Sequence, residues 1–223
     1  MTTRAGRHMD ARAARLLTCG VLAGPLFTFA WLVEGATRAD YDPLRHPISS
    51  LALGELGWTQ TLNFLVTGGL MLAFAVGLWR AQPPDRRTRW GTLLIGAYAV
   101  GLIGAGAFVT DPVSGYPPGS PDRLAGYSTE GVLHDLFSTL VFLGLPAACF
   151  VFARHFGRLG ERRWARWSAV TGAVFAVGTV LASLAFGQAD GLVAWGGLLQ
   201  RITLTIGWTW LTLLAIDLRR RAA

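Results

Sequence analysis

Six long apolar segments, separated by links rich in arginine, proline or glycine, constrain this chain more than any other feature. The predicted segments are residues 16–33, 62–78, 90–109, 130–152, 167–186 and 197–216. As helices, they are about long enough to cross a hydrocarbon core of about 30 Å. Only 15% of the residues are charged, against about 25% in an average soluble domain. The sequence therefore predicts an all-α polytopic membrane protein, with a six-transmembrane-helix bundle forming one domain over residues 1–223.

The distribution of arginine predicts how this bundle is oriented. All 20 basic residues are arginine, and sixteen lie in the N-terminal head, the links after the second and fourth segments, and the C-terminal tail. The other four are Arg38, Arg45, Arg123 and Arg201. Short arginine-rich loops stay in the cytoplasm, so both termini are expected to be cytoplasmic. We expect a multi-pass protein of the cytoplasmic membrane, surrounded by lipids, and no nucleic-acid partner despite the net charge of +7.

Small residues at helical spacing mark places where helices can approach closely. Gly20 and Gly24 are four apart in the first segment, and Ala97, Gly101 and Ala105 are four apart in the third. Such spacing is typical of tightly packed transmembrane helices.

The loop of residues 41–57, YDPLRHPISSLALGELG, joins the first two segments and lies on the side away from the arginine-rich links. It concentrates Asp42, Arg45, His46 and Ser49 within eight positions. Pro47 is expected to begin a short helix over residues 48–53 that ends at Gly54. These polar groups predict a binding site at this membrane face. An Asp42–Arg45 ion pair that only fixes the loop is the alternative.

The fourth segment carries the best candidate for acid/base chemistry. Glu130, His134 and Ser138 are four residues apart and so share one helix face, with Asp135 about 100° away. Ionisable groups at membrane depth are costly and usually face a wet cavity or a partner. His134 is therefore interpreted as a general base or proton relay. The alternative is a histidine satisfied by a carboxylate or carbonyl of a neighbouring helix.

Two further charged residues are expected at the same face. Asp111 directly follows the third segment in FVTDP, where it could either serve the site or cap a helix and form a turn. Arg201, beside Gln200 at the start of the sixth segment, is expected to bind Asp111, Asp135 or an anionic ligand. Structural pairing of Arg201 is the alternative to ligand binding.

No motif in the sequence names a reaction. There is no HExxH zinc pattern, no GxSxG nucleophile turn and no glycine-rich phosphate loop. We therefore predict neither a metal nor a cofactor.

Three stretches of the chain resemble the DUF998 family. They are YDPLRHPISSLALGELGWTQTLNF, GAFVTDP and GVLHDLFS. This is a family of six-helix membrane proteins from bacteria and archaea whose function is unknown, and the similarity extends from the first apolar segment to the sixth. The resemblance implies an integral membrane fold and offers no substrate or catalytic residue. The arginine-only, alanine- and glycine-rich composition fits a bacterial source.

Two hypotheses for function remain open at the sequence level. In the first, the protein is an intramembrane enzyme acting by acid/base chemistry on a lipid or isoprenoid-like substrate. The catalytic candidates are then His134, Asp111, Asp135 and His46. The substrate-binding candidates are Asp42, Arg45, Ser49, Ser138 and Arg201. In the second, the same outward-facing pocket serves binding, transport or an accessory role without catalysis.

Overall fold

Each of the six apolar segments forms one α-helix in the computed structural model, which describes residues 11–81 and 86–222. The helices are α1 (Ala11–Thr37), α2 (Gly57–Ala81), α3 (Arg86–Ala107), α4 (Thr129–Arg158), α5 (Arg162–Phe186) and α6 (Gly196–Ala222). The predicted all-helical class is thereby confirmed for these residues. Most helices continue past the apolar limits because arginine is a good helix former and extends the ends into water. Two arginines of the N-terminal head, Arg4 and Arg7, lie outside the described residues. The same is true of link residues 82–85.

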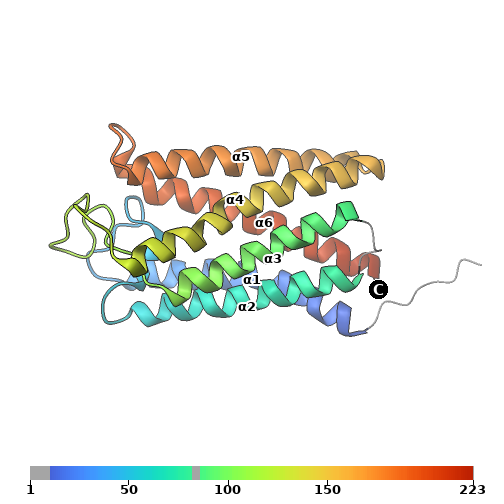
Figure 1. Ribbon diagram of the computed structural model, residues 1–223, viewed down its shortest axis with the longest axis horizontal. Helices are drawn as coiled ribbons and strands as arrows, with labels where there is room; N and C mark the ends of the chain where they lie inside the picture. Colours follow the sequence, from blue (N-terminus) through green and yellow to red (C-terminus); the bar gives the residue numbers. More distant parts are fainter. Residues whose placement is uncertain (1–10, 82–85, 223) are drawn as a thin grey trace, which may run out of the picture.

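Consecutive helices run antiparallel, and each packs against its neighbours in the sequence (Figure 1). α6 packs against α1 as well as α5, which closes the six helices into a ring. The beginning of α1 and the end of α6 therefore lie at the same end of the bundle (Figure 1). We name this the arginine end. The opposite end, the loop end, carries residues 38–56, 108–128 and 187–195, with short 3-10 helices η1 (Ile48–Ala52) and η2 (Val193–Trp195).

Five of the described helices, all except α6, are long and apolar enough to cross a membrane. Gln200, Arg201 and several threonines lower the hydropathy of α6. The outer surface is also apolar: Phe29, Leu143 and Val177 each expose more than half of their surface. Such residues are normally covered in a water-soluble protein. The helices and this surface indicate a multi-pass membrane protein.

Glycines set the close approach of neighbouring helices. A Cβ at Gly20 would lie 2.6 Å from the Phe74 ring of α2, and one at Gly24 would lie 2.7 Å from Thr212 of α6. At Gly101, a Cβ would lie 2.8 Å from the backbone oxygen of Phe137 in α4. The glycines predicted from their spacing to lie at helix contacts therefore do lie where two helices approach closely.

Aromatic rings fill the centre of the bundle just below the loop end. The centroid of Trp208 lies 5.3 Å from that of Phe27 and 5.4 Å from that of Tyr98, and Phe27 lies 5.8 Å from Phe64. These rings come from α1, α2, α3 and α6. They form an apolar base above which the polar residues of the loop end are held.

Candidate functional site

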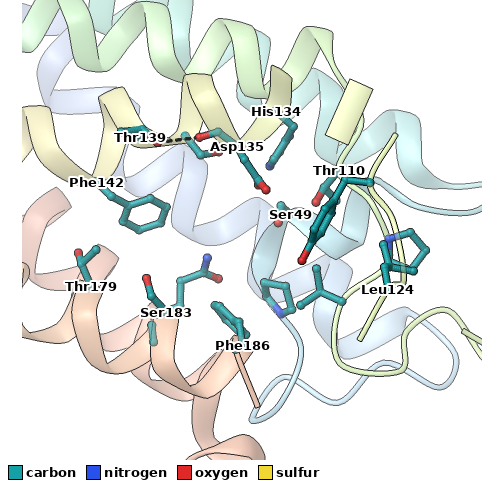
Figure 2. Close-up of a pocket in the computed structure, with 18 of the residues that line it drawn as sticks. Ser49, Thr110, Leu124, His134, Asp135, Thr139, Phe142, Thr179, Ser183 and Phe186 are labelled. Carbon is teal, nitrogen blue, oxygen red and sulfur yellow. Dashed lines mark hydrogen bonds between the residues drawn. The ribbon is translucent and has the colours of Figure 1, made fainter. Parts of the chain in front are cut away.

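A cavity of about 770 Å³ lies at the loop end, between α4, α5 and the loops of residues 38–56 and 108–128 (Figure 2). This volume is within the range of small-molecule sites, about 300–1,000 Å³. Its main polar lining residues are Ser49, Thr110, His134, Asp135, Ser138 and Gln200. Its apolar lining includes Phe142, Leu143 and Phe186. The cavity therefore joins a polar region to an apolar one.

His134 is buried, and its ring orientation is fixed by two backbone carbonyls at the end of α3. Its Nδ1 lies 2.9 Å from the oxygen of Ala105 and 3.0 Å from that of Phe108. A carbonyl oxygen can only accept, so Nδ1 carries the proton, and in the neutral ring Nε2 is an acceptor. No protein group within the described ranges bonds Nε2. The expected alternative, satisfaction by a neighbouring carbonyl, is confirmed for one nitrogen and leaves the other available to the cavity.

Asp135 faces the same cavity from the next position of α4. Figure 2 shows its carboxylate and the His134 ring directed toward a common space, with Ser49 on the far side. Its charge interacts with both His134 and Asp111. Thr139 is anchored to the backbone of this residue, because its hydroxyl donates to the Asp135 carbonyl at 2.9 Å. No described protein group forms a hydrogen bond or ion pair with the Asp135 carboxylate, which therefore remains available to exchange a proton with a bound molecule.

Asp111 lies beside the cavity and serves the N-terminus of α4. Its carboxylate accepts a hydrogen bond from the backbone N–H of Ser128 at 2.8 Å, and the Ser128 hydroxyl accepts from Gly131 at 2.9 Å. A Cβ at Gly131 would lie 2.1 Å from the Asp111 carboxylate. The Asp111 carboxylate satisfies the backbone N–H of Ser128, the N-cap residue, and interacts favourably with the helix dipole. Asp111 is not a lining residue, and its carboxylate supports the start of α4, whereas the alternative interpretation gave it a role in the turn that follows the third segment.

Ser49, Ser138 and Gln200 surround a smaller chamber of about 40 Å³ that adjoins the main cavity and also borders His134. Gln200 holds η1 in place, since its Oε1 accepts from the backbone N–H of Ile48 at 2.8 Å. Its amide nitrogen is then left as a donor. Tyr98 also borders this chamber, and its buried hydroxyl has no hydrogen-bond partner among the described residues. The chamber is large enough for a water molecule or a small ligand group.

Asp42 and His46 stabilise their own loop and do not line the cavity. The Asp42 carboxylate accepts from the backbone N–H of Leu44 at 2.9 Å, and His46 Nδ1 accepts from the backbone N–H of Asp42 at 2.9 Å. His46 packs against Tyr41 and Tyr116, whose rings also contact each other. Burial lowers the pKa of His46, although the nearby Asp42 carboxylate opposes this. A neutral ring fits its role as an acceptor.

Arg45 fixes one loop to another. Its guanidinium lies 2.7 Å from the carboxylate of Asp122 and donates to the backbone oxygen of Ser114 at 3.0 Å. The ion pair with Asp42, the alternative considered for this loop, is not formed, because the loop of residues 108–128 brings Asp122 to Arg45 instead. Arg123 extends this closure by donating to the backbone oxygen of Gly187 at the end of α5.

Arg201 is buried and attaches the polar loop to α6. Its Nη1 donates to the backbone oxygens of Pro43 at 2.7 Å, His46 at 2.9 Å and Gly197 at 3.0 Å, and Nη2 donates to the hydroxyl of Tyr41. Burial raises the pKa of Tyr41 to about 12, although Arg201 opposes this. The expected pairing with Asp111 or Asp135 is wrong, and the structural alternative is confirmed.

Several lining residues were missed by the sequence interpretation. They are Thr110, Asp122, Arg123, Leu124 and Tyr127 from the loop of residues 108–128, and Thr179, Ser183 and Phe186 from α5. The unusual length of this loop was an available signal, because long loops in compact domains are often functional. In the part of the chain that the structure describes, no group of three or more His, Cys, Asp or Glu side chains could hold a metal ion.

Comparison with known proteins identifies a family. A family model described as "Protein of unknown function (DUF998)" matches residues 21–217, nearly the whole chain. Searches of curated proteins and of solved structures found no significant match.

Proposed function

The chain belongs to the DUF998 family, and from its site geometry we propose that it is a bacterial cytoplasmic-membrane enzyme acting on a lipid or isoprenoid-like amphiphile. In this proposal all six helices cross the membrane and both termini are cytoplasmic. α6 is included because it packs between α5 and α1 in the closed ring. The sixteen arginines of the links and termini support the orientation.

The shape of the cavity supports an amphiphilic substrate. Leu143 lines the cavity and is 62% exposed, so the cavity reaches the apolar outer surface between α4 and α5. Leu143 follows His134 by nine residues, which is about 13 Å along a helix. A polar head can then lie beside His134, Ser49 and Gln200 while its chain leaves past Leu143 and Phe186 toward lipid.

The orientation of His134 is the observation that carries the catalytic part. Two carbonyls hold Nδ1–H, so Nε2 is an acceptor beside the cavity. It removes a proton from a hydroxyl of the substrate, a water molecule or a serine. The adjacent Asp135 exchanges protons with the bound molecule. A general base of this kind contributes about 10²–10⁴-fold to a rate.

A lipid-profile experiment tests this proposal. A deletion strain is complemented with the parent protein, with His134→Asn or with Leu143→Trp, and extracted lipids are compared by mass spectrometry. Asparagine retains a donor near the Nδ1 position and removes Nε2, so His134→Asn should fold, bind lipid and leave the substrate unconverted. Leu143→Trp narrows the apolar opening and should reduce conversion by impeding entry. Asp42→Asn, outside the cavity, is the control and should restore the profile.

The second hypothesis is binding without catalysis. It is favoured by one observation: within the described ranges, neither Ser49 nor Ser138 makes a hydrogen bond with His134, so no nucleophile–base pair is preformed. In that case His134→Asn restores the lipid profile completely while the purified protein still retains a lipid. That result would reject the enzymatic proposal, whereas an unconverted lipid in the His134→Asn strain would reject simple binding.

A further inference from the structure

A groove of about 890 Å³ lies at the arginine end, between the first turns of α5 and the last turns of α6. We name it the α5–α6 groove. α5 contributes Arg163, Trp164, Arg166, Trp167 and Val170. α6 contributes Leu213, Ile216, Asp217 and Arg220. On both helices the main lining residues recur at intervals of three and four, so each helix presents one continuous face to the groove.

The lining residues change in character with depth in the same direction on both helices. Val170 follows Arg163 by seven residues and Leu213 precedes Arg220 by seven, each about 10 Å along the axis. Because the helices are antiparallel, both arginines lie toward the bundle end and both aliphatic side chains lie toward its middle. Trp167 lies between Arg163 and Val170 on α5, and tryptophan side chains prefer the membrane interface. This sequence of charge, aromatic ring and aliphatic surface matches the order of phosphate, interface and acyl chain in a phospholipid.

The two acidic groups near the groove share one partner, Arg221. Arg221 lies 2.6 Å from the carboxylate of Asp217 and 2.5 Å from that of Glu161. Its hydrogen bond lowers the pKa of Glu161, which keeps that carboxylate ionised. By contrast, the three groove arginines, at positions 163, 166 and 220, are exposed and have no carboxylate partner among the described residues. With three arginines and one carboxylate in its lining, the groove presents net positive charge above an apolar wall.

We propose that the α5–α6 groove binds an anionic phospholipid of the surrounding membrane. The three groove arginines hold the headgroup phosphate, and one acyl chain lies along Val170, Leu213 and Ile216. Guanidinium groups suit phosphate because they form paired, charge-assisted hydrogen bonds. Basic pockets between transmembrane helices are known to recognise anionic headgroups. This site shares no residue with the loop-end cavity and does not depend on the proposed enzymatic function.

Native mass spectrometry of the full chain tests the proposal. The protein is released from a neutral detergent containing equal amounts of phosphatidylglycerol and phosphatidylcholine, and we expect it to retain one phosphatidylglycerol. In the triple variant Arg163→Gln, Arg166→Gln and Arg220→Gln, the affinity for that lipid should fall about a hundredfold. The matched control, Arg158→Gln, Arg162→Gln and Arg219→Gln, removes the same charge from the same end outside the groove. It should retain the lipid.

Three outcomes would overturn the proposal. An equal loss of affinity for phosphatidylglycerol in both triple variants would show that net charge attracts the lipid without a specific site. Equal retention of the two lipids would remove the requirement for an anionic headgroup. Stabilisation against heat by inorganic phosphate, equal to that by phosphatidylglycerol, would indicate an anion site without a lipid. Thermal unfolding without lipid verifies that each variant folds, and the single variants Arg220→Gln and Arg219→Gln repeat the comparison if the triple variants unfold.

Discussion

His134 and Arg201 are both buried at the loop end, yet their polar atoms are used in different ways. Arg201 donates through Nη1 and Nη2 to three backbone oxygens and a tyrosine hydroxyl, all belonging to the protein, and only its buried Nε has no partner among the described residues. His134 uses only Nδ1, and no described protein group bonds its Nε2. Buried polar groups are normally satisfied, so a remaining acceptor beside a cavity indicates a ligand or water. At the residue scale, Arg201 therefore belongs to the framework and His134 to the site.

The framework role of Arg201 predicts a large loss of stability in Arg201→Gln. Glutamine is too short to replace its bonds to Pro43, His46 and Tyr41, so the free energy of unfolding should fall by about 3 kcal/mol. For a chain of this size, that corresponds to a decrease in Tm of roughly 6–12 °C in detergent. Arg123→Gln is the control, because Arg123 is exposed and bonds one carbonyl; its loss should stay below about 1 kcal/mol. Equal losses in the two variants would contradict the framework role.

At the scale of elements, regular helices followed from the sequence but contacts between loops did not. Apolar length predicts a helix, and spacing of four predicts that His134 and Ser138 share a face. The partner of Arg45 could not be predicted, because Asp122 is 77 residues away on a loop without periodicity. Asp42 is three residues from Arg45 and was a possible partner, but its carboxylate accepts from the backbone N–H of Leu44 instead. Contacts between loops depend on the relative positions of the helix ends that they connect. Local sequence patterns do not determine those positions.

The crossing of α3 and α4 depends on the absence of a side chain at Gly101. In Gly101→Ala the added Cβ would lie 2.8 Å from the Phe137 backbone oxygen, and a backbone atom in a helix cannot easily move. Such overpacking should lower the free energy of unfolding by about 1–3 kcal/mol. Gly69→Ala in α2 is the control, because no atom lies within 4 Å of its added Cβ; it should be neutral or gain up to about 1 kcal/mol. Thermal unfolding of both proteins in one detergent compares them directly. A Gly101→Ala protein as stable as the parent would contradict this packing.

At the scale of the whole molecule, the predicted site was recovered only in part. Ser49, His134, Asp135 and Ser138 line one cavity as expected. The other five predicted residues form hydrogen bonds or ion pairs that hold the surrounding loops and helix ends in place; they are Asp42, Arg45, His46, Asp111 and Arg201. Helical spacing predicts which side chains share a face of a helix. It does not predict where a neighbouring helix leaves space beside that face for a cavity. The opening between α4 and α5 arises from packing of the complete ring. It could therefore not be predicted from any single segment.

The orientation of the ring decides which side of the membrane the loop-end cavity faces. In a protein with Cys19→Ala and Cys149→Ala, Tyr127→Cys places a thiol at the loop end and Leu159→Cys places one at the arginine end; both positions are exposed. If the sixteen arginines hold their end in the cytoplasm, a membrane-impermeant maleimide should modify Tyr127→Cys in intact cells and Leu159→Cys only after lysis. The reverse pattern would contradict the proposed orientation. It would also place the cavity, and any amphiphile reaching it between α4 and α5, in the cytoplasmic leaflet.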